Sequence, residues 1–332
     1  MATRRLSERV QAAWQHGAPW LPLLYPLSWL LARVARARLW WFRRRQRLPP
    51  VPVLVVGNVS VGGTGKTPLV VALCEYLCSR QLKVVVISRG YGARPPRYPW
   101  AVETDQPASM AGDEPLLIRR RTGVPVVIDP RRARALAFAL GEYRPDVVIS
   151  DDGLQHYALP RTVELAVLDA RRGLGNGRCL PAGPLREPAT RLDEVDFVVL
   201  NGHPDRRWPQ ATVMVLQPDD PVHLQTGKVL PMEDFSARHP IVQALAGIGD
   251  PQRFFSALSA WDLRVTGHAF PDHYQYQSDD LAPFAGQTVI MTEKDAVKCH
   301  EFAGDHAWYL PVSARLPTVF LEDLYQRLMR SG

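Results

Sequence analysis

Short apolar runs alternate with helix-like segments through the first two hundred residues. Each run is rich in valine, isoleucine and leucine and lacks the apolar–polar alternation of a half-exposed strand. Strands that are buried on both faces of a parallel sheet have this composition. The runs are residues 51–56, 83–88, 124–128, 146–150, 165–169 and 197–200, and residues 68–80 and 131–143 have helical patterns. The alternation predicts an α/β fold built on a doubly wound, mostly parallel sheet.

The pattern changes around residues 204–221, where the chain becomes polar and rich in proline. Apolar runs and a helical pattern then resume, which predicts a second, smaller α/β domain. The last twenty residues have a helical pattern. The expected division is an N-terminal helical arm (1–48), the main core (49–205), the smaller α/β domain (206–312) and a C-terminal helix that packs back on the core (313–332).

The N-terminal arm combines apolar and aromatic residues with dense arginine. No charged side chain occurs between Arg9 and Arg33, and seven arginines follow by residue 47. Tryptophan and tyrosine favour the lipid headgroup region, and clustered arginine favours anionic lipid. The apolar stretch is shorter than the roughly 20 residues that a membrane crossing needs, and it contains Pro22 and Pro26. We predict an interfacial or half-inserted helix, with a single span and packing on the protein's own core as alternatives.

The formal net charge of +7 belongs almost entirely to this arm. Residues 1–50 contain ten arginines and one acidic residue, whereas the other 282 residues contain 30 basic and 32 acidic side chains. A nearly neutral body argues against nucleic acid as a partner, because a nucleic-acid-binding body carries its own basic face. The four cysteines form no metal or disulfide pattern and fit a reducing cytoplasm.

A glycine-rich segment lies between the first predicted strand and the first predicted helix. Its residues are Ser60, Val61, Gly62, Gly63, Thr64, Gly65, Lys66 and Thr67. Glycines let backbone N–H groups converge on phosphate oxygens, the helix N-terminus adds its dipole, and Lys66 supplies a mobile positive charge. Thr67 is placed to offer its hydroxyl to Mg²⁺. The segment predicts a nucleotide-binding P-loop, although Ser60 stands where the general pattern has glycine.

Two carboxylates, Asp151 and Asp152, directly follow the apolar run at 146–150. In P-loop proteins the aspartate associated with Mg²⁺ occupies this position. A nearby Mg²⁺ or Lys66 would relieve the repulsion between two adjacent negative charges. The alternative is an aspartate-rich turn or helix cap. Gln155 and His156 could reach the same site, but each alone is a weak signal.

Three other segments carry candidate chemistry. Asp113 or Glu114 could act as a general base, although both are also ordinary first-turn helix residues. Arg186, on a proline-rich loop, could stabilise charge on a transferring phosphoryl group, although a solvated arginine is the default. His273 follows an aspartate, as in a base with an orienting partner, although a lone histidine is more often structural.

Together, seven segments make the chain resemble the tetraacyldisaccharide 4′-kinase family of lipid A biosynthesis in Gram-negative bacteria. They are Val56–Pro68, Ser88–Gly92, Gly112–Pro115, Asp151–His156, Pro181–Glu187, Phe270–Tyr274 and Thr292–Lys298. The segments occur in the family's order, and the resemblance runs over nearly the whole chain. Ser60, unusual against the general P-loop pattern, matches this family's own version.

The resemblance implies a membrane-associated enzyme with a P-loop kinase core and a smaller α/β domain that closes over it. The reaction would move the γ-phosphate of ATP to the 4′-hydroxyl of a tetraacylated disaccharide 1-phosphate, at the cytoplasmic face of the inner membrane and with no obligate protein partner. The family's roles carry over to matching positions. Lys66 and Thr67 would hold phosphates and Mg²⁺, Asp151 and Asp152 would organise the metal and the lysine, Arg186 would stabilise transferred charge, and Asp113 paired with His273 would activate the hydroxyl.

The main alternative is a membrane-surface P-loop ATPase switch of the partitioning or positioning type. Such proteins typically carry a second lysine just before the paired glycines, where this chain has Val61. A GTPase would need an Asn-Lys-x-Asp segment, and Thr292-Glu-Lys-Asp295 does not fit that pattern. A non-enzymatic lipid-binding module would have no use for Lys66 or for the acidic cluster.

Overall fold

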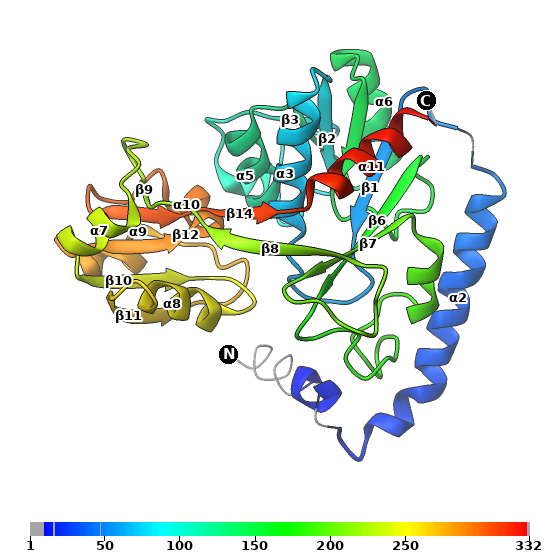
Figure 1. Ribbon diagram of the computed structural model, residues 1–332, viewed down its shortest axis with the longest axis horizontal. Coiled ribbons are helices and arrows are strands. Elements are labelled where there is room, and N and C mark those ends of the chain that lie inside the picture. Colours follow the sequence, from blue (N-terminus) through cyan, green and yellow to red (C-terminus); the bar gives the residue numbers. More distant parts are fainter. Residues whose placement is uncertain (1–9, 16, 47, 331–332) are drawn as a thin grey trace. The chain divides into compact units, whose positions relative to one another are not determined.

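The computed structural model describes residues 10–15, 17–46 and 48–330 and divides into two compact units (Figure 1). The first unit comprises the described residues up to Arg89, then Asp129–Val215, then those from Arg315 onward. The second unit comprises Gly90–Ile128 and Leu216–Ala314. The chain therefore leaves the first unit twice, and each unit is built from segments that are far apart in sequence.

The first unit is organised around a parallel sheet with the strand order β8-β7-β6-β1-β5-β2. All neighbouring strands in this series run parallel. The strands are β1 (Val53–Gly57), β2 (Val84–Ser88), β5 (Val147–Ser150), β6 (Val163–Asp169), β7 (Phe197–Asn201) and β8 (Thr212–Pro218). Every residue of β1, β2 and β5 is buried, as the apolar runs predict. The predicted parallel α/β sheet is confirmed.

Helices pack against this sheet. The helices are α3 (Lys66–Ser79), α6 (Arg132–Tyr143), the 3₁₀ helix η2 (Ala189–Glu194) and α11 (Thr318–Met329). Helix α3 contacts β1 and β2, and α6 contacts β2. Helix α3 begins directly after the glycine-rich loop and buries Leu69, Leu73 and Leu77. Helix α11 packs on α3, and Tyr76 Oη lies 3.1 Å from Glu322 Oε2 across that contact.

The second unit contains a smaller five-stranded sheet with the order β11-β10-β12-β13-β9. Its strands are β9 (Val222–His223), β10 (Ile241–Ala246), β11 (Arg264–Ala269), β12 (Val289–Thr292) and β13 (Ala307–Leu310), and only the β13–β9 pair is antiparallel. Its helices are α4 (Ala108–Ala111), α5 (Asp113–Thr122), α7 (Met232–Arg238), α8 (Pro251–Ser259), α9 (Ser278–Leu281), η3 (Ala282–Phe284) and α10 (Glu293–Cys299). Strands β3 (Trp100–Val102) and β4 (Val126–Ile128) form an antiparallel pair, and β14 (Val312–Arg315) ends at the unit boundary.

The expected domain division differs from these units most of all at residues 90–128, and by smaller shifts at the two later boundaries. Residues 90–128 were expected in the core that spans 49–205, but they group with the second unit. The reason is that α5 packs on α10, more than 170 residues further along the chain. The apolar run at 124–128 continues the pattern of the preceding strands, so it carries no sign of this long-range packing. The functional roles assigned to the domains stay predictions.

The N-terminal arm is helical and lies against the first unit. Residues 10–15 form a helical turn, followed by η1 (Leu21–Leu24) and α2 (Tyr25–Arg43), which runs along the side of the unit in Figure 1. Pro22 and Pro26 each lie at the start of a helix, where proline costs no hydrogen bond. Within the described ranges, no helix has the length and apolar character that a membrane crossing requires.

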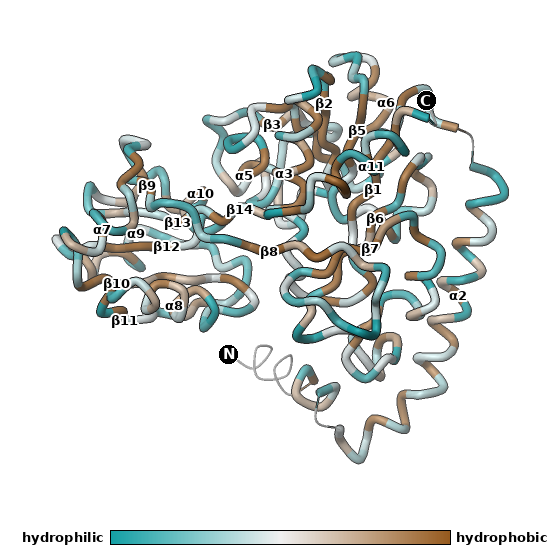
Figure 2. Tube along the Cα trace, in the orientation of Figure 1, coloured by the Kyte–Doolittle hydropathy of each residue, from teal (hydrophilic) through white to brown (hydrophobic). Residues whose placement is uncertain are grey.

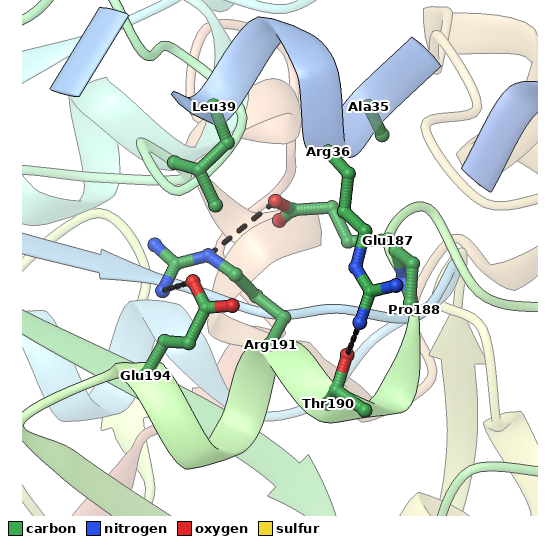
Figure 3. Close-up of a pocket in the computed structure, with 8 residues that line it drawn as sticks. All are labelled: Ala35, Arg36, Leu39, Glu187, Pro188, Thr190, Arg191 and Glu194. Carbon is green, nitrogen blue, oxygen red and sulfur yellow. Dashed lines mark hydrogen bonds and ion pairs between the residues drawn. The ribbon is translucent and has the colours of Figure 1, made fainter. Parts of the chain in front are cut away.

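Polar contacts hold α2 to the first unit at both ends. Ser28 Oγ donates to the carbonyl oxygen of Cys179 at 2.7 Å, and Arg43 pairs with Glu194 at 2.8 Å and with Glu164 at 3.2 Å. Between them, Leu39 is buried beside η2, and Figure 3 shows the small pocket that Ala35, Arg36 and Leu39 form with η2. The arm therefore does pack on the protein's own core along one face.

The rest of α2 leaves apolar side chains exposed. Figure 2 colours the backbone trace by hydropathy and shows hydrophobic segments along this helix. Most of the exposed large hydrophobic residues in the described chain lie in or near this arm. They are Trp20, Leu23, Leu27, Trp29, Leu30, Leu31, Val34, Trp40, Trp41 and Leu48. Arginines stack on the tryptophans, and the guanidinium of Arg45 lies 3.4 Å from the ring centre of Trp41. An arginine-rich, aromatic surface of this kind suits a lipid headgroup layer.

Candidate active site

The glycine-rich segment follows β1, and its last two residues, Lys66 and Thr67, begin α3, as the sequence predicts. Gly62 and Gly65 have φ angles of 104° and 87°, which glycine adopts without strain. The Val61 N–H donates to the Pro184 carbonyl at 2.8 Å, and Ser60 pairs with Leu185 in an antiparallel bridge. Ser60 and Val61 thus attach the loop to the segment that carries Arg186. The remaining loop residues, Gly62 to Gly65, lead into Lys66 and Thr67 at the helix N-terminus.

Lys66, Asp152 and Arg186 come together beside this loop. Lys66 Nζ lies 3.4 Å from Asp152 Oδ1 and 3.2 Å from Asn58 Oδ1. Arg186 Nη1 donates to both carboxylate oxygens of Asp152 at 3.2 Å. Two positive groups therefore share one carboxylate, which positions both cations at the end of the P-loop. An incoming polyphosphate would find preformed positive charge there.

The protonation state of Asp152 follows from this pairing. Burial alone would raise its pKa, but the nearby charges of Lys66 and then Arg186, with their hydrogen bonds, outweigh burial and lower it. Asp152 is therefore a carboxylate at neutral pH. Its backbone has a φ of 48°, a left-handed conformation that is uncommon for a residue other than glycine. Unusual backbone geometry of this kind concentrates at functional sites.

Asp151 points into a more enclosed setting than its neighbour. It is only 2% exposed, and its carbonyl oxygen accepts a hydrogen bond from Arg132 Nη2 at 3.0 Å. Burial lowers the pKa of Arg132 to about 10, which still leaves its guanidinium protonated at neutral pH. Burial, followed by the charges of Arg132 and Arg89, lowers the pKa of His156 to about 4. His156 is therefore neutral and is no cation for phosphate at physiological pH.

The donor set near the loop fits Mg²⁺ held jointly by protein and phosphate. Across the described residues, no three His, Cys, Asp or Glu side chains lie close enough together to hold a metal without other ligands. Mg²⁺ is usually bound through one or two carboxylates together with phosphate oxygens and water. Within the same described part of the chain, the hydroxyl of Thr64 is buried with no hydrogen-bonding partner. Thr67, Asp151 and Asp152 supply the hydroxyl and carboxylate oxygens that such an ion prefers.

Several further polar residues support this cluster. The sequence alone assigned them no role, or only a weak one. Asn58 bridges Lys66 and the loop, since its Nδ2 donates to the Ser60 carbonyl at 2.7 Å. Gln155 donates to the Asn58 carbonyl at 3.0 Å and to Glu187 at 2.6 Å, and it accepts from Arg186 at 3.3 Å. Asn58 and Glu187 lie inside the matching motifs, directly after β1 and directly after Arg186. Their positions next to other motif residues could have identified both as parts of the site.

The second unit contains the other predicted pair. Asp113 is the first residue of α5 and is buried, and its Oδ2 lies 3.2 Å from His273 Nδ1. The helix N-terminus favours the negative charge of Asp113. His273 has a φ of 60°, so its backbone is also left-handed. The structure therefore brings together two residues that are 160 positions apart in sequence.

Further charged groups surround the histidine. Lys294, on α10, places Nζ 3.3 Å from His273 Nε2, 3.2 Å from Glu114 Oε1 and 3.3 Å from Asp272 Oδ1. The ring of Tyr91 lies 5.0 Å from the ring of His273, centre to centre. Glu114, weighed as an alternative base, is thus an ion-pair partner of Lys294, whereas Asp113 contacts the histidine. The sequence alone did not identify Lys294 as a functional residue. It is one of four charged residues in the segment Thr292–Lys298, and nothing in that segment sets it apart from the other three.

Known proteins match this chain over nearly its whole length. The family model described as tetraacyldisaccharide-1-P 4′-kinase (LpxK) matches residues 20–329. A tetraacyldisaccharide 4′-kinase from Alcanivorax borkumensis is 56% identical over 98% of both chains, and one from Pseudomonas aeruginosa is 54% identical over 93% of both. A crystal structure titled as the "apo" form of LpxK from Aquifex aeolicus in complex with ATP superposes with a TM-score of 0.75 at 27% identity, covering 93% of this chain and 99% of that one. The resemblance inferred from the motifs is confirmed: the chain belongs to the tetraacyldisaccharide-1-P 4′-kinase family.

Proposed function

We propose that this protein transfers the γ-phosphoryl group of ATP to the 4′-hydroxyl of a tetraacyldisaccharide 1-phosphate in lipid A biosynthesis. The observation that carries the proposal is the Lys66–Asp152–Arg186 cluster beside a P-loop, in a chain that belongs to this kinase family. A P-loop alone would fit hydrolysis as well as transfer. Family membership favours transfer over the ATPase switch, since the related proteins are named as kinases.

ATP is the proposed donor because a solved relative was crystallised in complex with it. Residues Gly62 to Lys66 would contact the β- and γ-phosphates through backbone N–H groups and the lysine ammonium. Mg²⁺, when bound, neutralises charge on the phosphates. Thr67 with Asp151 or Asp152 would hold it. Arg186 would stabilise charge that develops on the transferring group, and its position is maintained by Asp152 and Gln155.

Asp113 is the proposed general base. A hydroxyl must lose its proton as it attacks the phosphoryl group, and a carboxylate within hydrogen-bonding reach can accept that proton. Asp113 is 4% exposed overall and has one oxygen, Oδ2, directed to His273. That contact leaves Oδ1 as the oxygen to receive the proton. The contact with His273 also restricts the rotation of the carboxylate.

The acceptor explains the exposed arm. Each CH₂ of an acyl chain gains about 0.8 kcal/mol when it is removed from water, so a lipid with four acyl chains does not leave the bilayer readily. An enzyme for such a lipid works at the membrane surface. We propose that the exposed tryptophans of α2 and its arginines bind the cytoplasmic face of the inner membrane, in a peripheral or monotopic manner.

The test is incubation of the purified protein with ³²P-labelled ATP and detergent-solubilised tetraacyldisaccharide 1-phosphate. We expect label in the lipid product with the wild type. With Asp113→Asn we expect transfer to fall by about 10²- to 10⁴-fold, the usual contribution of a general base. The matched control is Glu233→Gln, which changes an exposed acidic residue at the start of α7 in the same unit.

Two outcomes would count against the proposal. Near-normal transfer by Asp113→Asn would remove Asp113 as the base. Label that appears only as free phosphate, with no labelled lipid from any acylated disaccharide acceptor, would favour the ATPase switch.

A further inference from the structure

The imidazole of His273 is held on three sides by groups of the second unit. Nδ1 faces the Asp113 carboxylate at 3.2 Å, Nε2 faces the Lys294 ammonium at 3.3 Å, and the Tyr91 ring lies 5.0 Å away. Asp272 Oδ1 lies 4.0 Å from Nε2, beyond hydrogen-bonding distance. The contacts of the two ring nitrogens therefore differ in kind: one meets an acceptor and the other meets a donor.

The difference determines which nitrogen carries the proton. An ammonium group has three N–H donors and no acceptor, so Nε2 can only meet it as a lone-pair acceptor. A neutral imidazole has a single N–H, which then belongs to Nδ1 and is donated to Asp113. The opposite tautomer would direct an N–H at the ammonium and a lone pair at the carboxylate. A doubly protonated ring would bring two positive charges to 3.3 Å.

Lys294 is itself well fixed as a cation. Glu114 and Asp272 accept from its ammonium at 3.2 and 3.3 Å, and its side chain is only 18% exposed. Burial would lower the pKa of Lys294, but the carboxylates of Glu114, Asp272 and Asp113 outweigh burial and raise it. The lysine therefore stays charged across the working pH range. Its two carboxylate partners keep the ammonium beside the ring.

We propose that Lys294 is a positioning residue that fixes His273 in the Nδ1–H tautomer. This inference rests on the proposed role of Asp113 as the base and deepens it. Because Nδ1 already bears a hydrogen, it cannot take up the proton that Asp113 removes from the substrate hydroxyl. His273 then orients the carboxylate and stabilises its negative charge through one hydrogen bond. It does not relay the proton.

The direct test is the tautomer of His273 in the full-length protein without substrate. Long-range ¹H–¹⁵N correlation spectra distinguish the two neutral tautomers, and the signal lost in His273→Gln identifies the residue among the nine histidines. We expect Nδ1–H with a lone pair on Nε2 in the wild type. In Lys294→Met, which keeps the chain length without the donor, we expect the Nε2–H tautomer to become populated. Lys294→Arg should restore the wild-type pattern.

Kinetics provide the second readout. Partners that orient a metal-binding histidine typically contribute about 10- to 100-fold to activity. By analogy, we expect kcat of Lys294→Met to fall within that range, with KM for ATP unchanged. Lys228→Met, at an exposed lysine of the same unit, is the control, and thermal unfolding of each variant reports on folding. Lys294→Arg should recover most of kcat.

The proposal is overturned if His273 carries its hydrogen on Nε2 in the wild type, or if Lys294→Met leaves the Nδ1–H tautomer and kcat unchanged. Since the spectra need no substrate, their result is independent of the reaction assigned to the protein. Failure of the general-base assignment would instead show as retained transfer by Asp113→Asn.

Discussion

Single side chains in this protein have their charge states determined by their neighbours, and the outcome differs from site to site. Asp152 is kept ionised by Lys66 and Arg186 in spite of burial, which otherwise favours its neutral form. His156, four residues later, is kept neutral by burial and by the arginines Arg132 and Arg89. The two residues follow the same strand, yet only the first can serve as a charged group near the P-loop.

The state of His156 predicts a pH-dependent stability. Its pKa is about 4 in the folded protein and is ordinarily 6.5, so the unfolded chain binds a proton more readily as the pH falls. The contribution of the neutral ring to the free energy of unfolding is complete above pH 6.5 and is lost as the pH falls toward 4. We expect wild type to lose about 2 kcal/mol of unfolding free energy at this site between about pH 7 and pH 4.5, allowing for its partial exposure.

Urea unfolding of wild type and His156→Gln at both pH values measures this contribution. The variant lacks the titrating group, so its unfolding free energy should fall less over the same interval. His203→Gln, at an exposed histidine of the same unit, should behave as wild type. Equal losses in wild type and His156→Gln would show that His156 does not titrate as described.

At the scale of elements, the start of α5 determines where the proposed base lies. Gly112 is the N-cap of this helix, with φ 85° and ψ 145°, a combination that is essentially restricted to glycine. A Cβ at this position would lie 3.3 Å from Pro115 Cδ and 3.4 Å from the Tyr91 carbonyl oxygen. The sharp turn between α4 and α5 therefore depends on the absence of a side chain, and Asp113 follows directly.

Gly112→Ala should accordingly affect both stability and turnover. We expect a loss of about 1–3 kcal/mol in the free energy of unfolding, the usual cost of a strained backbone conformation. We also expect a lower kcat, because Asp113 moves with the turn. Chemical denaturation and transfer assays measure the two effects. Gly304→Ala is the control because no atom lies within 4 Å of its Cβ position, and a Gly112→Ala protein indistinguishable from it would contradict the argument.

Elements with a clear local signal were predictable, and those defined by distant contacts were not. The buried strands β1, β2 and β5 and the P-loop were recognisable because apolar runs and glycine spacing are local properties. Strand β11 was missed because most of its side chains are exposed, so it has no apolar run. The pairing of Glu114 with Lys294 joins positions 180 residues apart, and no spacing rule reveals it. The role of Lys66 was predictable because it belongs to the glycine-rich loop. The roles of Asp113 and His273 could be predicted only from the family resemblance.

At the scale of the whole molecule, charge and apolar exposure both concentrate in one part of the chain. The first 50 residues contain ten arginines and one acidic residue, while the rest is nearly neutral. In α2, Trp29, Trp40 and Trp41 are 60%, 55% and 48% exposed and stack with arginines. Protein and membrane should therefore meet through this arm, with electrostatic and apolar contributions that can be measured separately.

Replacing Trp29, Trp40 and Trp41 together with serine should reduce sedimentation with anionic phospholipid vesicles by at least about tenfold in partition coefficient. Unfolding of the variant should match wild type, because these side chains are largely exposed. Added salt should weaken the remaining binding, which comes from arginine. Trp261→Ser, at an exposed tryptophan of the second unit, is the control. Undiminished sedimentation of the triple variant would refute the assignment of this surface to the membrane.

The path of the chain through the two units has a consequence for biosynthesis. Helix α11, the last in the chain, packs on α3, and the second unit joins Asp113 to His273 and Lys294 across more than 150 residues. Proteins emerge from the ribosome N-terminus first. The arginine-rich arm is therefore made long before either unit has all its parts. A chain cut short before residue 273 would contain the arm and the P-loop but neither the histidine nor the lysine. If the arm binds the membrane as proposed, such a truncated product would occupy the membrane surface without the partners of Asp113.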